Sequence, residues 1–152
     1  MENQALAERM EATLLPDWEL IPDFGLYMDQ IISFADKSAG PDGSGLTKPM
    51  VNNYVKSGLV DRPVGKTYTR ESIAQLLMIC RLKQVLSQEE LRRLLHGEKS
   101  TEELYGSYRR EQMAWQEELK QGDEPTREPL SYAIQAAACH TICRMLLQET
   151  AD

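Results

Sequence analysis

Residues 46–71 read "LTKPMVNNYVKSGLVDRPVGKTYTRE", and this stretch holds the signals that decide the fold. Thr47 is a preferred N-cap residue and Pro49 is well tolerated in the first turn, so a helix is expected to begin here. Gly58 supplies the left-handed backbone conformation that commonly ends one. Residues 59–68 are interrupted by a proline and a glycine, so they are too broken to continue as a helix. We therefore predict a short helix ending at Gly58, followed by a small β-hairpin or extended loop.

The predicted helix over 47–57 separates its side chains into two faces at 3.6 residues per turn. The apolar half contains Met50, Val51, Tyr54 and Val55, and the polar half contains Lys48, Asn52, Asn53 and Lys56. Asparagine can form a bidentate pair with adenine, and lysine can contact phosphate or guanine, so the polar half has the chemistry to enter a major groove. A solvated amphipathic helix has the same pattern and is the alternative interpretation.

Hydrophobic periodicity predicts further helices on both sides of this segment. They are expected over 26–35, from Thr69 to about Val85, from the Ser87 capping box to Leu95, over about 101–120 and over about 130–148. The helix after Thr69 is apolar around almost its full circumference and belongs at the centre of a core. The last helix is also apolar on most sides, so we expect it to be buried in the fold or in a partner. The sequence therefore predicts an all-α protein.

Charge is distributed unevenly along the chain, which has a net charge of -7. Residues 1–43 carry nine acids and two bases, residues 44–95 carry nine bases and four acids, and residues 96–152 carry eleven acids and six bases. The three segments therefore have net charges of -7, +5 and -5. A basic centre between acidic flanks indicates a localised anion-binding surface, and chance clustering on a solvated surface is the alternative.

The order of these elements is that of a helix-turn-helix with a wing. The wing is residues 59–68, and this region would offer Arg62, Lys66 and Arg70 to flanking phosphates. Phosphate contacts supply most of the affinity of such proteins, while the recognition helix reads base edges.

Two quoted segments, "TKPMVNNYVKSGLV" and "KTYTRESIAQLLMICRLKQVLSQEELRRLL", resemble the DNA-binding half of MerR-type transcription regulators. In that family a recognition helix ending in Gly-Leu is followed by a wing ending in Tyr. On this resemblance Asn52 and Asn53 fall where the family has DNA-contacting Arg and Tyr, Lys56 falls on a basic helix position, and Lys66 and Thr67 fall on the basic tip of the wing. The turn before the helix, about 37–45, is longer than in the MerR pattern.

A larger part of the chain, from about Trp18 to Leu95, resembles domain-of-unknown-function family 1836, an uncharacterised bacterial family. The similarity lies in "LPDWELIPD", "LYMDQII" and "LTKPMVNNYVKSGLV". That family is usually presumed regulatory, and the resemblance brings no established activity with it.

Together, the pattern and the resemblances divide the chain into three parts. Residues 1–24 form an N-terminal irregular and helical segment, and residues 25–96 form a MerR-like winged helix-turn-helix domain with a small β wing. Residues 97–152 form a C-terminal helical extension, which we expect to provide a dimer or partner surface.

Other chemistry has little support in the sequence. Cys139 and Cys143 lie four residues apart with His140 between them, but we expect structural, partly buried cysteines there and no metal site. Cys80 lies in the most apolar helix and is expected in the core. No nucleophile, P-loop or dinucleotide motif is present, so we predict neither an enzyme nor a cofactor.

The sequence also indicates a cellular compartment. Three cysteines without framework spacing suit a reducing cytoplasm. The opening "MENQALAERM" lacks the basic and apolar regions of a signal peptide, and the apolar stretch over 133–147 is too short to span a bilayer.

The sequence leaves two functional hypotheses. The first is a DNA-binding transcription regulator that acts on double-stranded DNA as a homodimer through its C-terminal helices. The second is a non-enzymatic protein–protein interaction module that keeps a helix-turn-helix scaffold and has lost DNA binding. The asparagines at 52 and 53 and the acidic net charge favour the second, and the basic centre favours the first.

Overall fold

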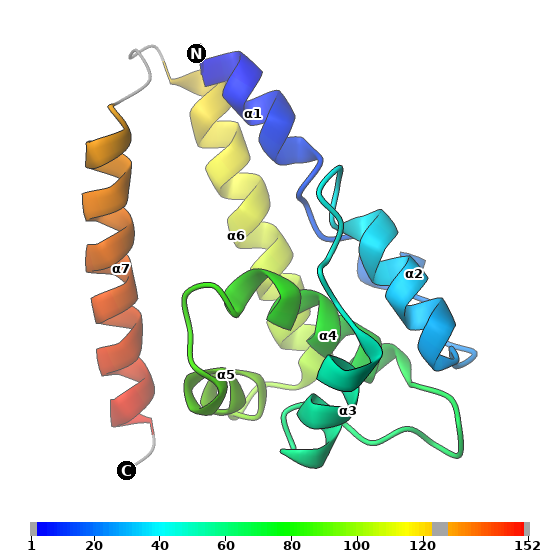
Figure 1. Cartoon of the computed structure of the whole chain (residues 1–152). Helices are drawn as coiled ribbons and strands as arrows, with labels where there is room; N and C mark the ends of the chain where they lie inside the picture. Colours follow the sequence, from blue (N-terminus) through cyan, green and yellow to red (C-terminus); the bar gives the residue numbers. More distant parts are fainter. Residues whose placement is uncertain (1–2, 123–127, 151–152) are drawn as a thin grey trace.

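The computed structural model describes residues 3–122 and 128–150 of the 152-residue chain. Within those residues it is helical and contains no β-strand, which confirms the all-α prediction (Figure 1). The helices are α1 (Asn3–Glu11), the 3-10 helix η1 (Trp18–Leu20), α2 (Met28–Ser38), α3 (Lys48–Lys56), α4 (Arg70–Leu82), α5 (Gln88–Leu95), α6 (Thr101–Gln121) and α7 (Pro129–Glu149). None of the helices in the described ranges is both long and apolar enough to cross a bilayer.

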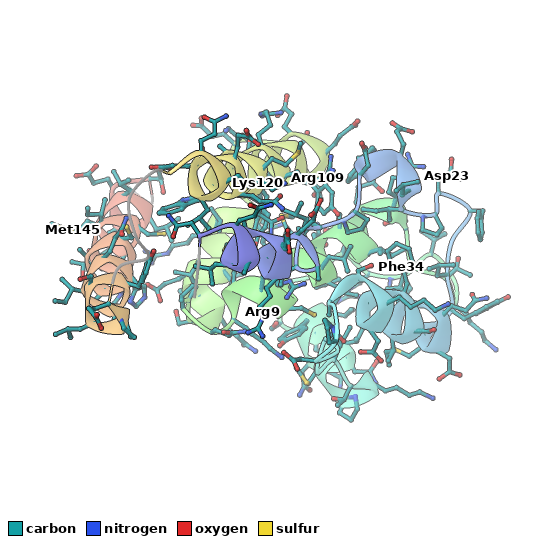
Figure 2. All side chains as sticks on the ribbon, turned by 90° about the horizontal axis from the view of Figure 1, so that it is seen from above. Arg9, Asp23, Phe34, Arg109, Lys120 and Met145 are labelled. Carbon is teal, nitrogen blue, oxygen red and sulfur yellow. The ribbon has the colours of Figure 1, made fainter. Side chains whose placement is uncertain are left out.

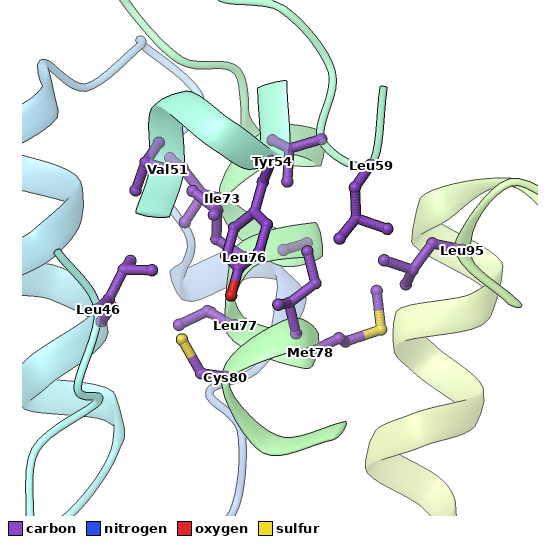
Figure 3. Close-up of a cluster of buried hydrophobic side chains, with 14 of the residues drawn as sticks. Leu46, Val51, Tyr54, Leu59, Ile73, Leu76, Leu77, Met78, Cys80 and Leu95 are labelled. Atoms are coloured by element: carbon purple, nitrogen blue, oxygen red, sulfur yellow. The ribbon is translucent and has the colours of Figure 1, made fainter. Parts of the chain in front are cut away.

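Helix α4 is the centre of the core, as its apolar circumference predicts. Every residue from Ser72 to Cys80 is buried. Figure 3 shows Val51 and Tyr54 of α3 directed toward side chains of α4, with Leu95 of α5 on another side. Burial of an apolar helix on several sides is the largest stabilising contribution available to a chain of this size.

The ends of α3 follow from its sequence. The Thr47 hydroxyl accepts a hydrogen bond from the Met50 amide at 3.3 Å, which satisfies one of the free donors at the start of the helix. At the other end Gly58 has φ +76°, and the amides of Leu59 and Val60 donate to the Tyr54 carbonyl at 2.9 and 3.1 Å. The chain is thereby turned sharply out of the helix, and the predicted boundaries are confirmed.

The long turn between α2 and α3 is tied down by one carboxylate. Asp36 accepts hydrogen bonds from the Ser44 hydroxyl at 2.5 Å and from the Ser44 amide at 3.1 Å. These two bonds, the hydroxyl first, lower the pKa of Asp36 below its ordinary value. The Ser44 hydroxyl in turn accepts from the Leu46 amide at 3.1 Å. The turn is therefore braced where it enters α3.

The predicted β wing over 59–68 does not form strands in the described part of the chain. It contains a tight turn in which the backbones of Val64 and Thr67 exchange two hydrogen bonds, at 2.8 and 3.2 Å. Tyr68 then pairs in the same way with Leu26, at 2.8 and 3.1 Å. Both polar backbone groups of Tyr68 are used by Leu26, and the two bridges are isolated pairs that make up no strand.

The N-terminal segment is held against α6 by side-chain hydrogen bonds to its backbone. Tyr105 donates its hydroxyl hydrogen to the Pro16 carbonyl at 2.6 Å, and Arg109 donates from Nε to the Leu15 carbonyl at 3.1 Å. Trp18 lies against the Tyr105 ring, with ring centroids 5.7 Å apart. The core therefore draws residues from all three predicted parts of the chain.

Helix α7 runs antiparallel to α6, stands apart from most of the molecule (Figure 1) and contacts mainly α5. Only Leu147 is buried, and Cys143 is half-buried against the core. Arg144 Nε forms an ion pair with Glu90 of α5 at 2.8 Å. Figure 2 shows Met145 on the side of α7 that points away from the body. Within a single chain, the last helix is therefore not buried in the fold.

Candidate nucleic-acid interface

The polar stripe of α3 faces solvent because the opposite side of the helix is fixed in the core. Val51 is fully buried and Tyr54 is 8% exposed, whereas Asn52, Asn53 and Lys56 are exposed. Burial raises the pKa of the Tyr54 hydroxyl. The side chains of Asn52, Asn53 and Lys56 form no hydrogen bond or ion pair with other described residues. Their donors and acceptors are therefore free to meet a polar ligand.

Lys48, the fourth residue of the predicted stripe, lies at the start of the same helix. Its Nζ lies 2.6 Å from Asp29 Oδ1 of α2, and both side chains are largely exposed. An exposed pair of this kind contributes little to stability, so the lysine can exchange its partner at low cost. No local sequence pattern predicts this pair, because Asp29 and Lys48 belong to different helices.

The turn after α3 brings two further cations to the same end of the molecule. Arg62 and Lys66 are exposed and form no ion pair within the described residues. Thr67 is half-buried, and its hydroxyl donates to the Val64 carbonyl at 3.2 Å. The apolar Val64 side chain is exposed at this turn. The segment thus presents two free positive charges on a short backbone turn.

Arg70, the last of the predicted phosphate contacts, is directed inward. Its Nε donates to the Ile21 carbonyl at 2.9 Å, and its guanidinium lies 5.6 Å from the centroid of the Trp18 ring. Asp23 lies 3.6 Å and Glu19 lies 4.0 Å from its terminal nitrogens, and only 19% of the side chain is exposed. Arg70 is therefore occupied in joining the N-terminal segment to α4 and is not grouped with Arg62 and Lys66.

Asp61, the acidic residue next to Arg62, is held by Gln75 of α4, which was not among the predicted site residues. Gln75, buried in α4, donates from Nε2 to the Asp61 carboxylate at 3.0 Å and accepts from the Asp61 amide at 2.9 Å. This pairing fixes the direction of the chain as it leaves α3. A buried glutamine in an apolar helix is the signal that could have identified it.

The cysteines and histidines form no comparable site. Cys80 is buried as expected and Cys143 is half-buried, but Cys139 is exposed, contrary to the prediction. Cys139 differs because α7 contacts the body along only one stripe. Over residues 3–122 and 128–150, no three His, Cys, Asp or Glu side chains are grouped to hold a metal ion.

The family model for Domain of unknown function (DUF1836) matches residues 16–114, more than half of the chain, and the chain belongs to this family. This confirms the family resemblance seen in the sequence. Comparison with curated proteins and with solved structures gave no match.

Proposed function

We propose that this chain is a DNA-binding transcription regulator with a MerR-like winged helix-turn-helix core. In the proposed complex α3 enters the major groove of double-stranded DNA and the 59–68 segment acts as the wing. The observation that carries the proposal is the free stripe of Asn52, Asn53 and Lys56 on a helix whose other face is anchored in the core. A rigid helix with unsatisfied amide and ammonium groups has the chemistry of direct readout.

The proposed contacts divide into two kinds. Asn52 and Asn53 read base edges, since a primary amide offers the paired donor and acceptor that adenine requires. Phosphates are contacted by Lys48, Lys56, Arg62 and Lys66, with the Thr67 hydroxyl beside them. All four cations are exposed, and Lys48 is the only one of them in an ion pair with another described residue. Arg70 takes a different part in the proposal: it holds the wing end of α4 against the Trp18 segment.

The regulator is proposed to act in the cytoplasm as a homodimer through its C-terminal helices. Two copies present two recognition helices, which matches the two-fold operators that helix-turn-helix proteins commonly read. The acidic segments 1–43 and 96–152, with net charges of -7 and -5, repel DNA outside the recognition face. Binding by one copy is then weak, and sequence match and dimerisation supply the rest.

The test is a selection from random DNA duplexes with the purified full chain, followed by affinity measurements on the selected site. Replacing Asn52 and Asn53 by Ala is expected to cost about 1–3 kcal/mol per lost base contact and to relax the selected sequence. Lys66→Ala is expected to weaken all duplexes equally, because a phosphate contact carries no sequence information. Lys120→Ala, an exposed lysine of α6, is the matched control and should change nothing.

The opposite result identifies the alternative function. If the folded dimer binds no duplex at low salt, α3 and the 59–68 segment do not bind DNA. The protein–protein interaction module on the same scaffold then replaces the regulator.

A further inference from the structure

We propose that an apolar groove formed by α1, α4, α5 and α6 receives α7 of a second copy of this chain. The inference rests on the homodimer of the proposed function and assigns the surface that the C-terminal helix contacts. It is independent of whether the protein binds DNA.

The groove is open and its walls are apolar. It has a volume of about 380 Å³. Its apolar lining residues are Met10, Leu14, Met78, Leu82, Leu94, Leu104, Tyr108 and Trp115. The polar lining residues are partly used already: Gln112 bonds the Thr13 carbonyl and the Leu15 amide through its two amide atoms, and Gln116 donates to the Ala7 carbonyl. An occupant therefore meets mainly hydrocarbon, and water in the groove finds few partners.

The groove cannot close by collapse of its walls. The hydrogen bonds of Gln112 and Gln116 to the N-terminal backbone fix the distance between α1 and α6. Arg109 adds a bond to the Leu15 carbonyl at 3.1 Å and an ion pair with Asp17 at 3.4 Å. A braced apolar groove that remains open in the single chain is a site for apolar surface from outside it.

The outer face of α7 has the matching chemistry. Its exposed apolar side chains are Leu130 (69%), Ile134 (61%), Ile142 (56%), Met145 (60%) and Leu146 (56%). Between Pro129 and Gln148 the only charged residue is Arg144, which is paired with Glu90. A helix that is apolar on most sides is normally covered on more than one side.

The outer face of α7 is long enough to cover the groove. Along α6 the groove extends from Leu104 to Trp115, and along α7 the exposed stripe includes the span from Ile134 to Met145. Each span rises by about 16 Å. One helix therefore covers the groove along its full length.

The occupant is a second copy because the chain's own α7 already uses its other side. Cys143 and Leu147 pack against the core while Met145 points away from it (Figure 2). The exposed large side chains of α7 are Leu130, Ile134, Ile142, Met145 and Leu146. At about 100 Å² each, two α7 helices packed only on each other would bury about 500 Å² of apolar surface per partner, below the roughly 800 Å² of a standard interface. In a two-fold symmetric dimer each copy inserts its α7 into the groove of the other copy. The groove and the outer face of α7 are therefore buried in both copies.

Disulfide cross-linking between two differently tagged chains tests this arrangement. In a Cys139→Ser background, one chain carries Ala138→Cys in the middle of α7 and the other carries Glu111→Cys on the groove. Both positions are exposed, and central positions make the result insensitive to the direction of the inserted helix. Mild oxidation of the mixture is expected to give mainly the mixed dimer. Pairing Ala138→Cys with Ser33→Cys, exposed on α2, is the control and should give no cross-link.

Two results would overturn the inference. Efficient cross-linking of Ala138→Cys to itself, with none to Glu111→Cys, would show that α7 packs on α7 and leaves the groove empty. A chain that sediments as a monomer at high concentration would remove the second copy altogether. In the supporting case, Ile142→Glu raises the dimer dissociation constant at least tenfold, and Ser33→Glu does not.

These measurements contain no DNA, so their failure is separable from that of the proposed function. A chain that binds a selected duplex but gives no groove cross-link rejects only the interface. A cross-linked dimer that binds no duplex rejects only the regulator.

Discussion

Helices α3 and α7 each leave one face uncovered, but the two faces are chemically opposite. The free face of α3 carries amides and an ammonium group, and the helix is fixed by caps at both ends and by Val51 and Tyr54 in the core. The free face of α7 is hydrocarbon, and a single contact stripe with one buried residue attaches the helix to the body. A polar free face on an anchored helix suits recognition of a polar partner, whereas an apolar free face on a loosely held helix suits assembly.

The largest effect on stability is expected from a substitution in the buried face of α3. Tyr54→Ala deletes a ring that lies between α3 and α4 (Figure 3) and should lower the free energy of unfolding by about 3–5 kcal/mol. Asn53→Ala, the adjacent residue on the free face, should change it by less than about 0.5 kcal/mol. Urea denaturation of both variants measures the difference. Equal effects would mean that α3 is not two-faced.

A smaller effect is expected at the attachment of α7. Leu147→Ala removes its buried contact and should cost about 2 kcal/mol, at the low end for a core leucine because the residue lies in the last turn of the helix. Ile142→Ala on the outer face should leave the stability of the monomer almost unchanged. Denaturation at a concentration where the chain is monomeric separates the two, since a dimer would add its own stabilisation. A larger loss from Ile142→Ala would reverse the assignment of inner and outer faces.

Arg70 and Arg62, the two arginines near the wing, should also differ in whether their removal affects stability or DNA binding. Arg70→Ala loses a hydrogen bond to the Ile21 carbonyl and a contact with the Trp18 ring, so it should lower stability by about 1–2 kcal/mol. Arg62→Ala should be neutral for stability and weaken DNA binding. Thermal unfolding and duplex affinity, measured on both variants, check this pair. The account of the wing is wrong if Arg62→Ala is the destabilising change.

The smallest effect concerns the turn that leads into α3. Asp36 has a lowered pKa in the folded state because Ser44 donates two hydrogen bonds to its carboxylate. Its contribution is therefore complete above the ordinary carboxyl pKa and is lost as the pH falls through the lower, folded value. The stability difference between the natural chain and Asp36→Ala should shrink below about pH 4. Asp42→Ala, exposed in the same turn, is the control, and an equal dependence on pH there would contradict the assignment.

How much of this could be predicted from sequence depends on whether the deciding interactions are local. The start and end of α3 and the Ser87 capping box depend on residues within about one turn of each other, and they were predicted correctly. The burial of α4 was also predicted correctly, because its apolar residues cover almost the full circumference of one continuous helix. The inward direction of Arg70 depends on Ile21 and Trp18, distant in sequence, and periodicity carries no information about them.

Helices α4 and α7 also show that the pattern within one helix does not identify its distant contacts. Both helices are apolar on most sides, so both were expected to be buried. Ser72 to Cys80 in α4 are buried within the chain, and α7 is not. Periodicity predicts that an apolar face needs a cover, but it does not say whether the cover comes from the same chain.

The most direct test of the central claim is the salt dependence of duplex binding. For the natural chain the logarithm of the binding constant should fall steeply with the logarithm of salt concentration, because lysine and arginine displace counterions from phosphates. Lys56→Glu together with Lys66→Glu should abolish binding or reduce the slope by about two per copy. The same reversals at Arg9 of α1 and Lys120 of α6, both exposed, should leave the slope unchanged. A slope that falls equally in both double variants, or no binding by the folded natural chain, would contradict the assignment of α3 and its wing as a DNA-binding face.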